Sequence, residues 1–209
     1  MSEFNTDNRR FIDVRIFFSK TGIAKYISHL DLYRAFGRTL KRSGLPLWVT
    51  EGFNPHIYTT FALPLALGVE GLEESLDVRL IEDVPFAQVA EKLNAVMPQG
   101  LAIIRVAAPV RKANDIERAR YMITANDDNA ELSRLDAYLS QDVINIVKKS
   151  KTKTQTLDVK PLLDWDCKSS ALTLPAGNTL SINPWNVLGD FTVNAARTAI
   201  LCSGNAKFE

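Results

Sequence analysis

An α+β fold is predicted for this chain by three observations. Between residues 10 and 108, strand-like alternation and helix-like periodicity follow one another as strand, helix, strand, strand, helix, strand. Residues 109–118 then have the polar, charged composition of a linker. After it, residues 119–209 again begin with a strand and a helix, without a residue-level repeat. The order in the first half is that of a ferredoxin-like βαββαβ domain, with two helices on one face of an antiparallel sheet. We expect the second half to be a divergent, degraded copy of this domain.

The first helix has the clearest signals. Ser28 can cap its free N–H groups, and Asp31, three residues on, can reach back as in a capping box. The helix is expected to run to Ser43 and to stop at Gly44. Helical spacing predicts an apolar face made of Leu30, Tyr33, Phe36, Gly37 and Leu40. The opposite face is basic and consists of Arg34, Arg38, Lys41 and Arg42.

The remaining elements follow from shorter patterns. Strands are predicted where β-branched and aromatic residues alternate, and helices where apolar residues recur every three or four positions. In the first half, the expected strands are 13–18, 47–50, 57–63, 76–81 and 101–106, and the second helix is 85–97. In the second half, the expected strands are 120–125, 143–147, 157–163, 171–174 and 196–202, and the helices are 130–139 and 184–188.

Composition narrows the classes of function. The 209 residues carry a net charge of +1, so any binding to phosphate must come from a local patch. The chain has two cysteines, Cys167 and Cys202, whereas a self-contained iron–sulfur site needs about four cysteine ligands. No apolar run approaches the roughly 20 residues that span a bilayer, and residues 1–9 look like a disordered polar leader. We therefore expect a cytoplasmic protein with no cofactor and no membrane contact.

The strongest candidate site surrounds the first helix, where basic residues gather near both histidines of the chain. Arg34, Arg38 and Arg42 recur at four-residue steps and therefore project from one side of the helix. Lys20 and Lys25, in the preceding loop, add to the local positive charge. This pattern predicts a phosphate-binding surface, for which an RNA backbone is the natural ligand. The alternative is an ordinary amphipathic helix with a solvated basic face.

The histidines and the loop after the helix offer further chemistry. His29 lies in the first turn of the helix and His56 in a turn-rich loop, and a ferredoxin-like domain can bring both to one end of its sheet. Either can then act as a general base on RNA, or both can hold a metal together with Asp31. Alternatively, His29 belongs to the capping region and His56 is a hydrogen-bonded loop residue. Phe53, beside Asn54 in the same loop, can stack on a base or a partner protein, or fill its own core.

A long, ordered set of motifs carries a family resemblance. The motifs are residues 18–22 (FSKTG), 25–32 (KYISHLDL), 44–46 (GLP), 51–56 (EGFNPH), 61–65 (FALPL) and 67–69 (LGV), with looser matches at Lys151, 158–160 and 197–198. In these motifs the chain resembles the radical SAM-linked protein family, a bacterial domain of unknown function. Members of that family are fused to, or encoded beside, a radical SAM enzyme. The resemblance therefore implies a partner or substrate-presenting domain for RNA modification, and not the chain that binds the cluster.

Three functions follow from these observations. The first is a non-catalytic accessory protein that recognises tRNA or rRNA, or presents it to a radical SAM partner. Recognition is expected from Lys20, His29, Asn54 and His56, with phosphates steered by Arg34, Arg38 and Arg42. The second is a metal-independent RNA-processing enzyme with His29 or His56 as general base. The third is a protein-interaction scaffold, in which Phe53 and residues 64–69 bind the partner enzyme.

Overall fold

The first half of the chain alternates strands and helices in the predicted order. The structure is a computed structural model, and it describes residues 11–125, 129–149 and 154–209. The first-half elements are β1 (Ile12–Lys20), α1 (His29–Arg42), β2 (Thr59–Phe61), β3 (Glu70–Leu80), α2 (Phe86–Asn94) and β4 (Leu101–Ala107).

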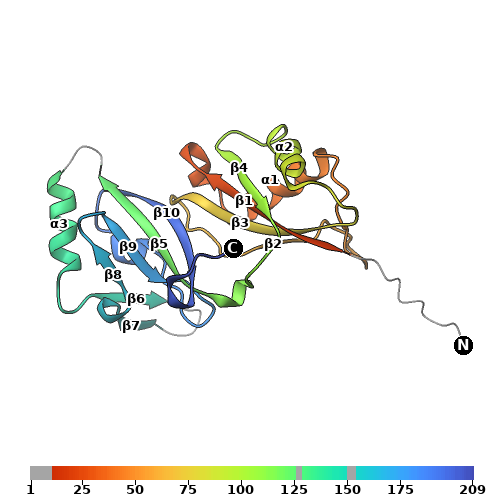
Figure 1. The fold of residues 1–209 in the computed structure, drawn as a ribbon. Coiled ribbons are helices and arrows are strands. Elements are labelled where there is room, and N and C mark those ends of the chain that lie inside the picture. Colours follow the sequence, from red (N-terminus) through yellow and green to blue (C-terminus); the bar gives the residue numbers. More distant parts are fainter. Residues whose placement is uncertain (1–10, 126–128, 150–153) are drawn as a thin grey trace, which may run out of the picture.

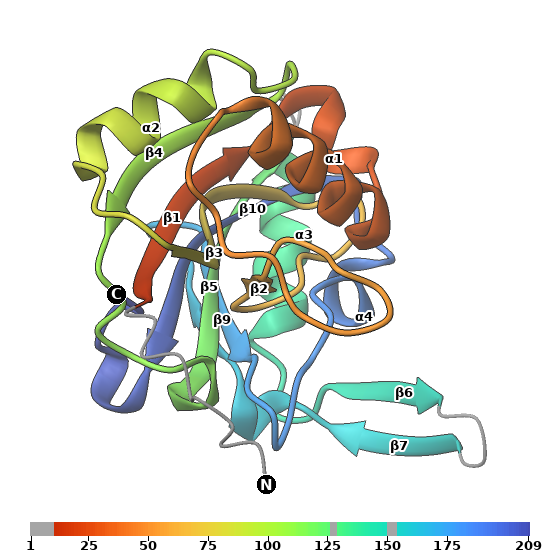
Figure 2. The ribbon, with the colours of Figure 1, turned by 90° about the vertical axis from the view of Figure 1, so that its right-hand side faces the viewer.

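The second half also combines strands with helices, so the mixed α+β character of the chain is confirmed. Its elements are β5 (Ile116–Ala125), α3 (Asn129–Leu139), β6 (Asn145–Lys149), β7 (Thr154–Asp158), β8 (Asp164–Asp166), β9 (Ala171–Pro175), α4 (Trp185–Leu188) and β10 (Val193–Cys202). Among the residues that the structure describes, strands β6 and β7 pair with each other and with no other strand, and they extend away from the rest of the fold (Figure 2).

One sheet runs through both halves. Among the described residues, its strands lie in the order β4-β1-β3-β10-β5-β9-β8, and β2 pairs with the end of β3 (Figure 1). The halves join where the start of β3 pairs in parallel with β10, at Glu70 with Ala196 and at Gly71 with Arg197. The other pairings that the described residues make in this sheet are antiparallel.

Gly71 leaves room for the Glu74 side chain at this junction. A Cβ at position 71 would lie 2.4 Å from Cγ of Glu74, whose side chain folds back over the glycine. Such a separation is a steric overlap, so a larger residue at position 71 would displace the Glu74 side chain.

Each half has its own hydrophobic core. In the first, Val14, Ile16 and Phe18 alternate along β1 and face the helices, where they meet Phe36 of α1 and Leu93 of α2. The apolar side chains of α1 and α2 therefore pack on one face of the sheet.

The second core includes residues from the first half of the chain. Helices α3 and α4 pack on β5, β9 and β10, and the segment between β2 and β3 contributes Leu65 and Val69 to the same cluster. That segment carries two of the motifs of the family resemblance, so these motifs help to build the contact between the halves.

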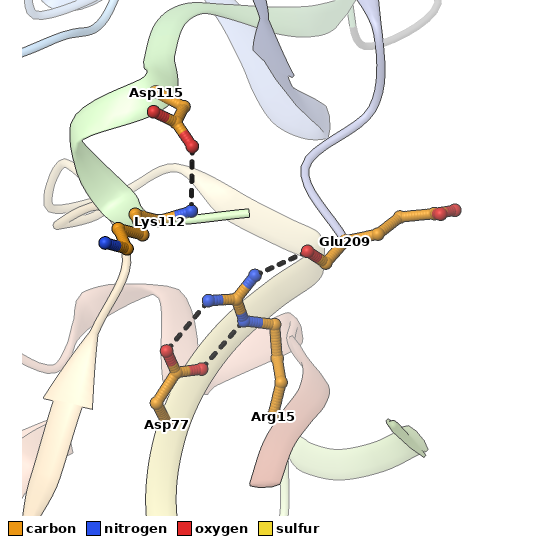
Figure 3. Close-up of polar contacts among 5 residues, drawn as sticks. All are labelled: Arg15, Asp77, Lys112, Asp115 and Glu209. Carbon is orange, nitrogen blue, oxygen red and sulfur yellow. Dashed lines mark hydrogen bonds and ion pairs between the residues drawn. The ribbon is translucent and has the colours of Figure 1, made fainter. Parts of the chain in front are cut away.

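Residues 208–209 pack against the other face of the first-half sheet, at Arg15 of β1. Arg15 is 1% exposed and makes two hydrogen bonds to the Asp77 carboxylate, at 2.7 and 2.8 Å. It also donates to the carbonyl oxygen of Glu209 at 2.7 Å (Figure 3). Its guanidinium lies 4.0 Å from the centre of the Phe208 ring. Buried charge on β1 is thereby paired and stacked rather than left unsatisfied.

Several predicted boundaries differ from the structure. The expected strand 157–163 is wrong beyond Asp158, where β7 ends, because Lys160–Leu162 form a short 3-10 helix and Pro161 has no N–H to donate to a sheet. Residues 47–50 form only isolated bridges, to Leu80 and Ile57, instead of a strand. Strand β3 begins at Glu70, earlier than expected, because its first residues pair with a strand that is distant in sequence. Strand β5 begins at Ile116, inside the expected linker, because that residue pairs with β10 and enters a small core.

Helix α1 begins as predicted. Oγ of Ser28 accepts a hydrogen bond from the Asp31 N–H at 3.1 Å, and the Ser28 hydroxyl in turn donates to the Asp31 carboxylate at 2.7 Å. The apolar face was only partly predicted, because Leu32 packs inward with Phe36 while Leu30 is 56% exposed. Leu32 lies four residues before Phe36 and shares its side of the helix, whereas Leu30 lies six residues before Phe36 and is rotated about 120° away from it.

The expected leader, residues 1–9, and Lys151 lie outside the described residues. In the part of the chain that the structure describes, no helix has both the length and the apolar composition needed to cross a membrane.

Candidate functional site

A basic groove of about 280 Å³ lies on the outer face of α1. One wall carries Arg34, Arg38 and Lys41, which share a face because they are four and three residues apart. The other wall includes His56 from the segment before β2 and Thr59, the first residue of β2. The structure thus brings the predicted basic helix face and the predicted histidine loop together in one site. We call Arg34, Arg38, Lys41 and His56 the basic groove.

Arg42 does not belong to this groove, although it was expected to steer phosphates with Arg34 and Arg38. Its guanidinium donates to the carbonyl oxygen of Val96 at 2.9 Å and so contacts the chain just after α2. Lys41, one residue earlier, lines the groove instead. One residue corresponds to about 100° of helix rotation, and this is enough to separate the two directions.

The loop beside the groove is closed at its base by His56. Its Nδ1 lies 3.0 Å from the carbonyl oxygen of Asn54 and 3.1 Å from Oγ1 of Thr50. The backbone closes the same turn, because the Thr50 N–H donates to the His56 carbonyl at 2.8 Å. At the tip, Phe53 is fully exposed, so the alternative in which it fills its own core is wrong.

Lys20 is placed differently from the prediction. It was expected to contact the ligand, but it is 1% exposed and donates to the carbonyl oxygens of Lys25 at 3.3 Å and Ile27 at 3.1 Å. Burial lowers the pKa of its ammonium group, an effect that the nearby Glu74 carboxylate opposes. Lys20 therefore holds the turn before α1 in place and does not contribute its charge to the surface.

Lys25 connects the two halves. Its ammonium group donates to Oδ1 of Asn194 in β10 at 3.2 Å and lies 5.4 Å from the centre of the Tyr26 ring. It is half-buried, so its side chain has a structural contact in addition to any role toward a ligand.

His29 does not line the groove. Its ring packs edge-on against Phe61, with ring centres 5.2 Å apart. Asp31 is held by Ser28, and this hydrogen bond lowers the pKa of the Asp31 carboxyl group. Among residues 11–125, 129–149 and 154–209, no three His, Cys, Asp or Glu side chains gather to hold a metal ion. The alternative metal set of His29, Asp31 and His56 is therefore not assembled.

The environment of His29 predicts a pH effect on stability. Burial, and then the charge of Lys20, lower the pKa of His29 below its ordinary value of 6.5. The folded chain therefore binds fewer protons than the unfolded chain near that pH, so stability is retained above pH 6.5 and falls below it. We expect His29→Gln to lose less thermal stability than the wild type between pH 7.5 and 5.5, measured by circular dichroism. An equal loss in both proteins would contradict this assignment.

A buried ion pair lies at the junction of the halves and was not predicted. Arg197 of β10 is 2% exposed and Glu74 of β3 is 3% exposed, and Nε of the arginine donates to the carboxylate at 2.8 Å. The guanidinium also donates to the carbonyl oxygens of Leu63 at 2.9 Å and Pro64 at 3.1 Å. Burial alone would lower the pKa of Arg197, but Glu74 raises it above its ordinary value. Arg197 therefore stays charged and ties the segment before β3 to the second half.

A cavity of about 600 Å³ opens beside this ion pair, and we call it the second-half cavity. Tyr121, directly opposite Arg197 in the neighbouring strand, lines it together with Arg197. Burial raises the pKa of the Tyr121 phenol, while Arg197 opposes the rise. The remaining lining residues are Leu63, Pro64, Leu65, Ala66, Val147, Ala176, Ser181, Ile182, Asn183 and Asn186.

Comparison with known proteins identifies a family. Residues 13–184 match a family described as an uncharacterised protein conserved in bacteria (DUF2344). The chain belongs to this family. No curated protein matches it.

The region matched by the DUF2344 family contains the basic groove and Tyr121 but ends before Arg197. A signal for Arg197 is nevertheless present in the sequence, because it is the one charged residue in the otherwise small and apolar run of residues 195–202. A lone charge in such a strand indicates a buried partner. The sequence does not indicate which residue that partner is.

Proposed function

We propose that this protein is a recognition module that binds RNA along the basic groove and works beside a radical SAM enzyme in RNA modification or processing. The proposal of RNA binding rests on one observation: three cationic side chains and His56 line the same groove. Arg34, Arg38 and Lys41 are all exposed, so phosphate oxygens can reach them. Their concentration on one surface supplies the local charge that the chain as a whole lacks.

Phe53 extends the same surface. It is fully exposed at the tip of the loop whose base includes His56. Exposed aromatic rings next to a basic groove are the usual platform on which bases of single-stranded nucleic acid stack. A groove for the backbone and a ring for the bases together favour single-stranded RNA over a duplex.

We also propose that residues 10–108 and 119–209 are two domains of ferredoxin-like topology. In the first, β1 lies between β4 and β3, and β2 pairs with the other edge of β3. In the second, β5 lies between β10 and β9, and β8 pairs with the other edge of β9. The same relative strand order in both halves supports a tandem arrangement, with the β6–β7 hairpin inserted in the second copy.

A surface for the partner enzyme is supported by exposed apolar side chains near the start of α1. Ile23 and Tyr26 are exposed in the turn before the helix, and Leu67 is exposed in the segment before β3. The Gly68 N–H donates to the Lys25 carbonyl at 2.9 Å, so the two segments lie side by side. Exposed apolar side chains that gather on a surface are typical of protein–protein contacts. The choice of a radical SAM enzyme as partner follows from the family resemblance in these motifs.

Removing the groove charges should weaken RNA binding. We expect the triple variant Arg34→Ala, Arg38→Ala, Lys41→Ala to reduce the slope of log affinity against log salt by about 2, at about 0.7 per lost contact on a single strand. Fluorescence anisotropy with a labelled single-stranded RNA at several salt concentrations measures both the slope and the affinity.

Two controls make this test specific. Lys112→Ala, Arg120→Ala, Lys168→Ala removes the same charge from exposed positions outside the groove and should change the slope little. Arg42→Ala removes a charge from α1 itself, but from the side that contacts Val96, and should also have little effect. Equal losses in the groove variant and in the controls would contradict a specific groove.

A second candidate function is favoured by the hydrogen bonds of His56. The Asn54 carbonyl can only accept, so its contact with Nδ1 favours the tautomer that leaves Nε2 unprotonated. An unprotonated nitrogen in a phosphate-binding groove can act as a general base in RNA cleavage. Cleavage of RNA by the purified chain, lost in His56→Ala, would establish this enzymatic role. RNA that stays intact in the presence of the purified chain would leave His56 as a binding residue.

A further inference from the structure

We propose that the second-half cavity binds a purine base, presented either as a free nucleoside or as an unpaired nucleotide of RNA. The RNA case rests on the proposed function, whereas the free-nucleoside case does not. Two buried polar side chains line the bottom of the cavity: Arg197, which is 2% exposed, and Tyr121, which is 4% exposed. We call them the floor of the cavity. Polar side chains that converge in a concave, otherwise apolar site are the general mark of ligand binding.

The charges at the floor select a neutral ligand. Arg197 is paired with Glu74, and its remaining donors are taken up by the Leu63 and Pro64 carbonyls and by Tyr121. An anion would therefore have to displace existing bonds of the guanidinium. A guanidinium can only donate, so the Tyr121 oxygen accepts from it and keeps its own proton for a ligand acceptor.

The rim carries side-chain amides. Oδ1 of Asn183 accepts a hydrogen bond from the backbone N–H of Trp185 at 3.1 Å. This bond orients the side-chain amide and leaves its two Nδ2 hydrogens as donors. Asn186, three residues on, is exposed and lines the same opening. Asparagine amides pair in a bidentate way with the N6 and N7 edge of adenine, where a donor and an acceptor lie next to each other. A purine can thus present one edge to these amides and a ring nitrogen to Tyr121.

The walls of the cavity are apolar and can pack against the two faces of a purine ring. Leu63 and Leu65 come from the segment before β3, and Ala176 and Ile182 from the segment between β9 and α4. The volume of about 600 Å³ lies within the range of roughly 300 to 1,000 Å³ that small-molecule sites occupy.

The wall before β3 is also fixed in place. Arg197 binds its carbonyl groups at positions 63 and 64, and the Trp185 indole N–H donates to the Leu67 carbonyl at 2.7 Å. The cavity is therefore formed before any ligand arrives, and binding requires little ordering of the chain.

Isothermal titration calorimetry of the full chain with adenosine, guanosine, cytidine and uridine tests the proposal. We expect saturable binding of a purine nucleoside with weak dependence on salt, and weaker or no binding of pyrimidines. Tyr121→Phe and Asn183→Asp should each lower the affinity about fivefold, because each removes one neutral hydrogen-bond donor. Asn183→Asp keeps the oxygen that accepts from Trp185, so the start of α4 is preserved.

A matched control and a second arm complete the test. Asn114→Asp makes the same chemical change at an exposed site outside the cavity and keeps its acceptor for Asn178, so it should not alter the affinity. The second arm compares RNAs that differ by one unpaired adenosine or an abasic site. A preference for the adenosine that is lost in Tyr121→Phe identifies RNA as the source of the base.

The experiments distinguish a failure of RNA binding at the basic groove from a failure of purine binding in the second-half cavity. If the triple variant of the basic groove loses RNA affinity but still binds the nucleoside, both sites are supported independently. No heat with any nucleoside, together with no base preference in RNA, would overturn the cavity proposal while leaving the groove untouched. Purine binding that is unchanged in both cavity variants, whose fold is verified by circular dichroism, would also overturn it, and so would equal affinity for pyrimidines.

Discussion

Glu74→Gln is expected to lower the free energy of unfolding by about 3 to 5 kcal/mol, the usual cost of removing one partner of a buried ion pair. Arg197 would keep its charge in a site where it is 2% exposed, and no carboxylate would compensate it. Lys20 would also lose the nearby charge that opposes the effect of burial on its pKa. Urea unfolding, followed by the fluorescence of the three tryptophans, measures the change.

An exposed ion pair provides the matched control. Arg34 and Asp31 pair at 3.4 Å on the surface of α1, with side chains 59% and 57% exposed. Arg34→Met should therefore cost less than about 1 kcal/mol. The double variant Glu74→Leu, Arg197→Met should be more stable than Glu74→Gln, because it removes both desolvated charges together. If Glu74→Gln cost no more than Arg34→Met, the pair would not be what holds β3 to β10.

Phe208→Ala is expected to lower the free energy of unfolding by about 3 kcal/mol, the lower end of the range for a buried phenylalanine. Its ring is 4% exposed, packs with Ile116, Ile200 and Cys202, and lies against the Arg15 guanidinium. The substitution leaves a cavity there and removes the ring that covers a buried charge on β1. Urea unfolding gives the energy, and hydrogen exchange should show faster exchange of β1 amides.

The chain contains its own control for this substitution. Phe53→Ala makes the same chemical change at a fully exposed ring and should alter stability by no more than about 0.5 kcal/mol. Phe53→Ala is instead expected to weaken RNA binding. Similar stability losses in the two variants would show that Phe208 is not part of the packed core.

The sequence predicted the components of the candidate site better than their positions. Ser28 and the helical spacing located α1, and the turn residues located the loop that carries His56. The sequence could not show that Lys20 is buried, because its neighbours in space include Glu74, far along the chain. It also could not separate Lys41 from Arg42, because both lie on the outer side of an isolated helix and the contact of Arg42 with Val96 depends on where α2 packs.

Pairings between distant residues account for most of the differences. Glu74 and Arg197 are 123 residues apart, and neither has a local pattern that names the other. The second-half cavity likewise combines residues 63–66 with residues from β5, β10 and the segment before α4. No periodicity spans such separations, so sequence patterns alone predicted neither the ion pair nor the cavity.

The sequence by itself determined most of the order of strands and helices in the first half, the start of α1 and the concentration of basic residues on its outer face. These depend on capping, on periodicity and on turn residues, all of which act over a few neighbouring positions. Only the tertiary structure decided which of the predicted basic side chains face solvent. It also decided that β3 and β10 join the halves and that Arg197 and Tyr121 form the floor of a cavity. These features depend on contacts between distant segments, whose free energy is gained only when the whole chain has packed.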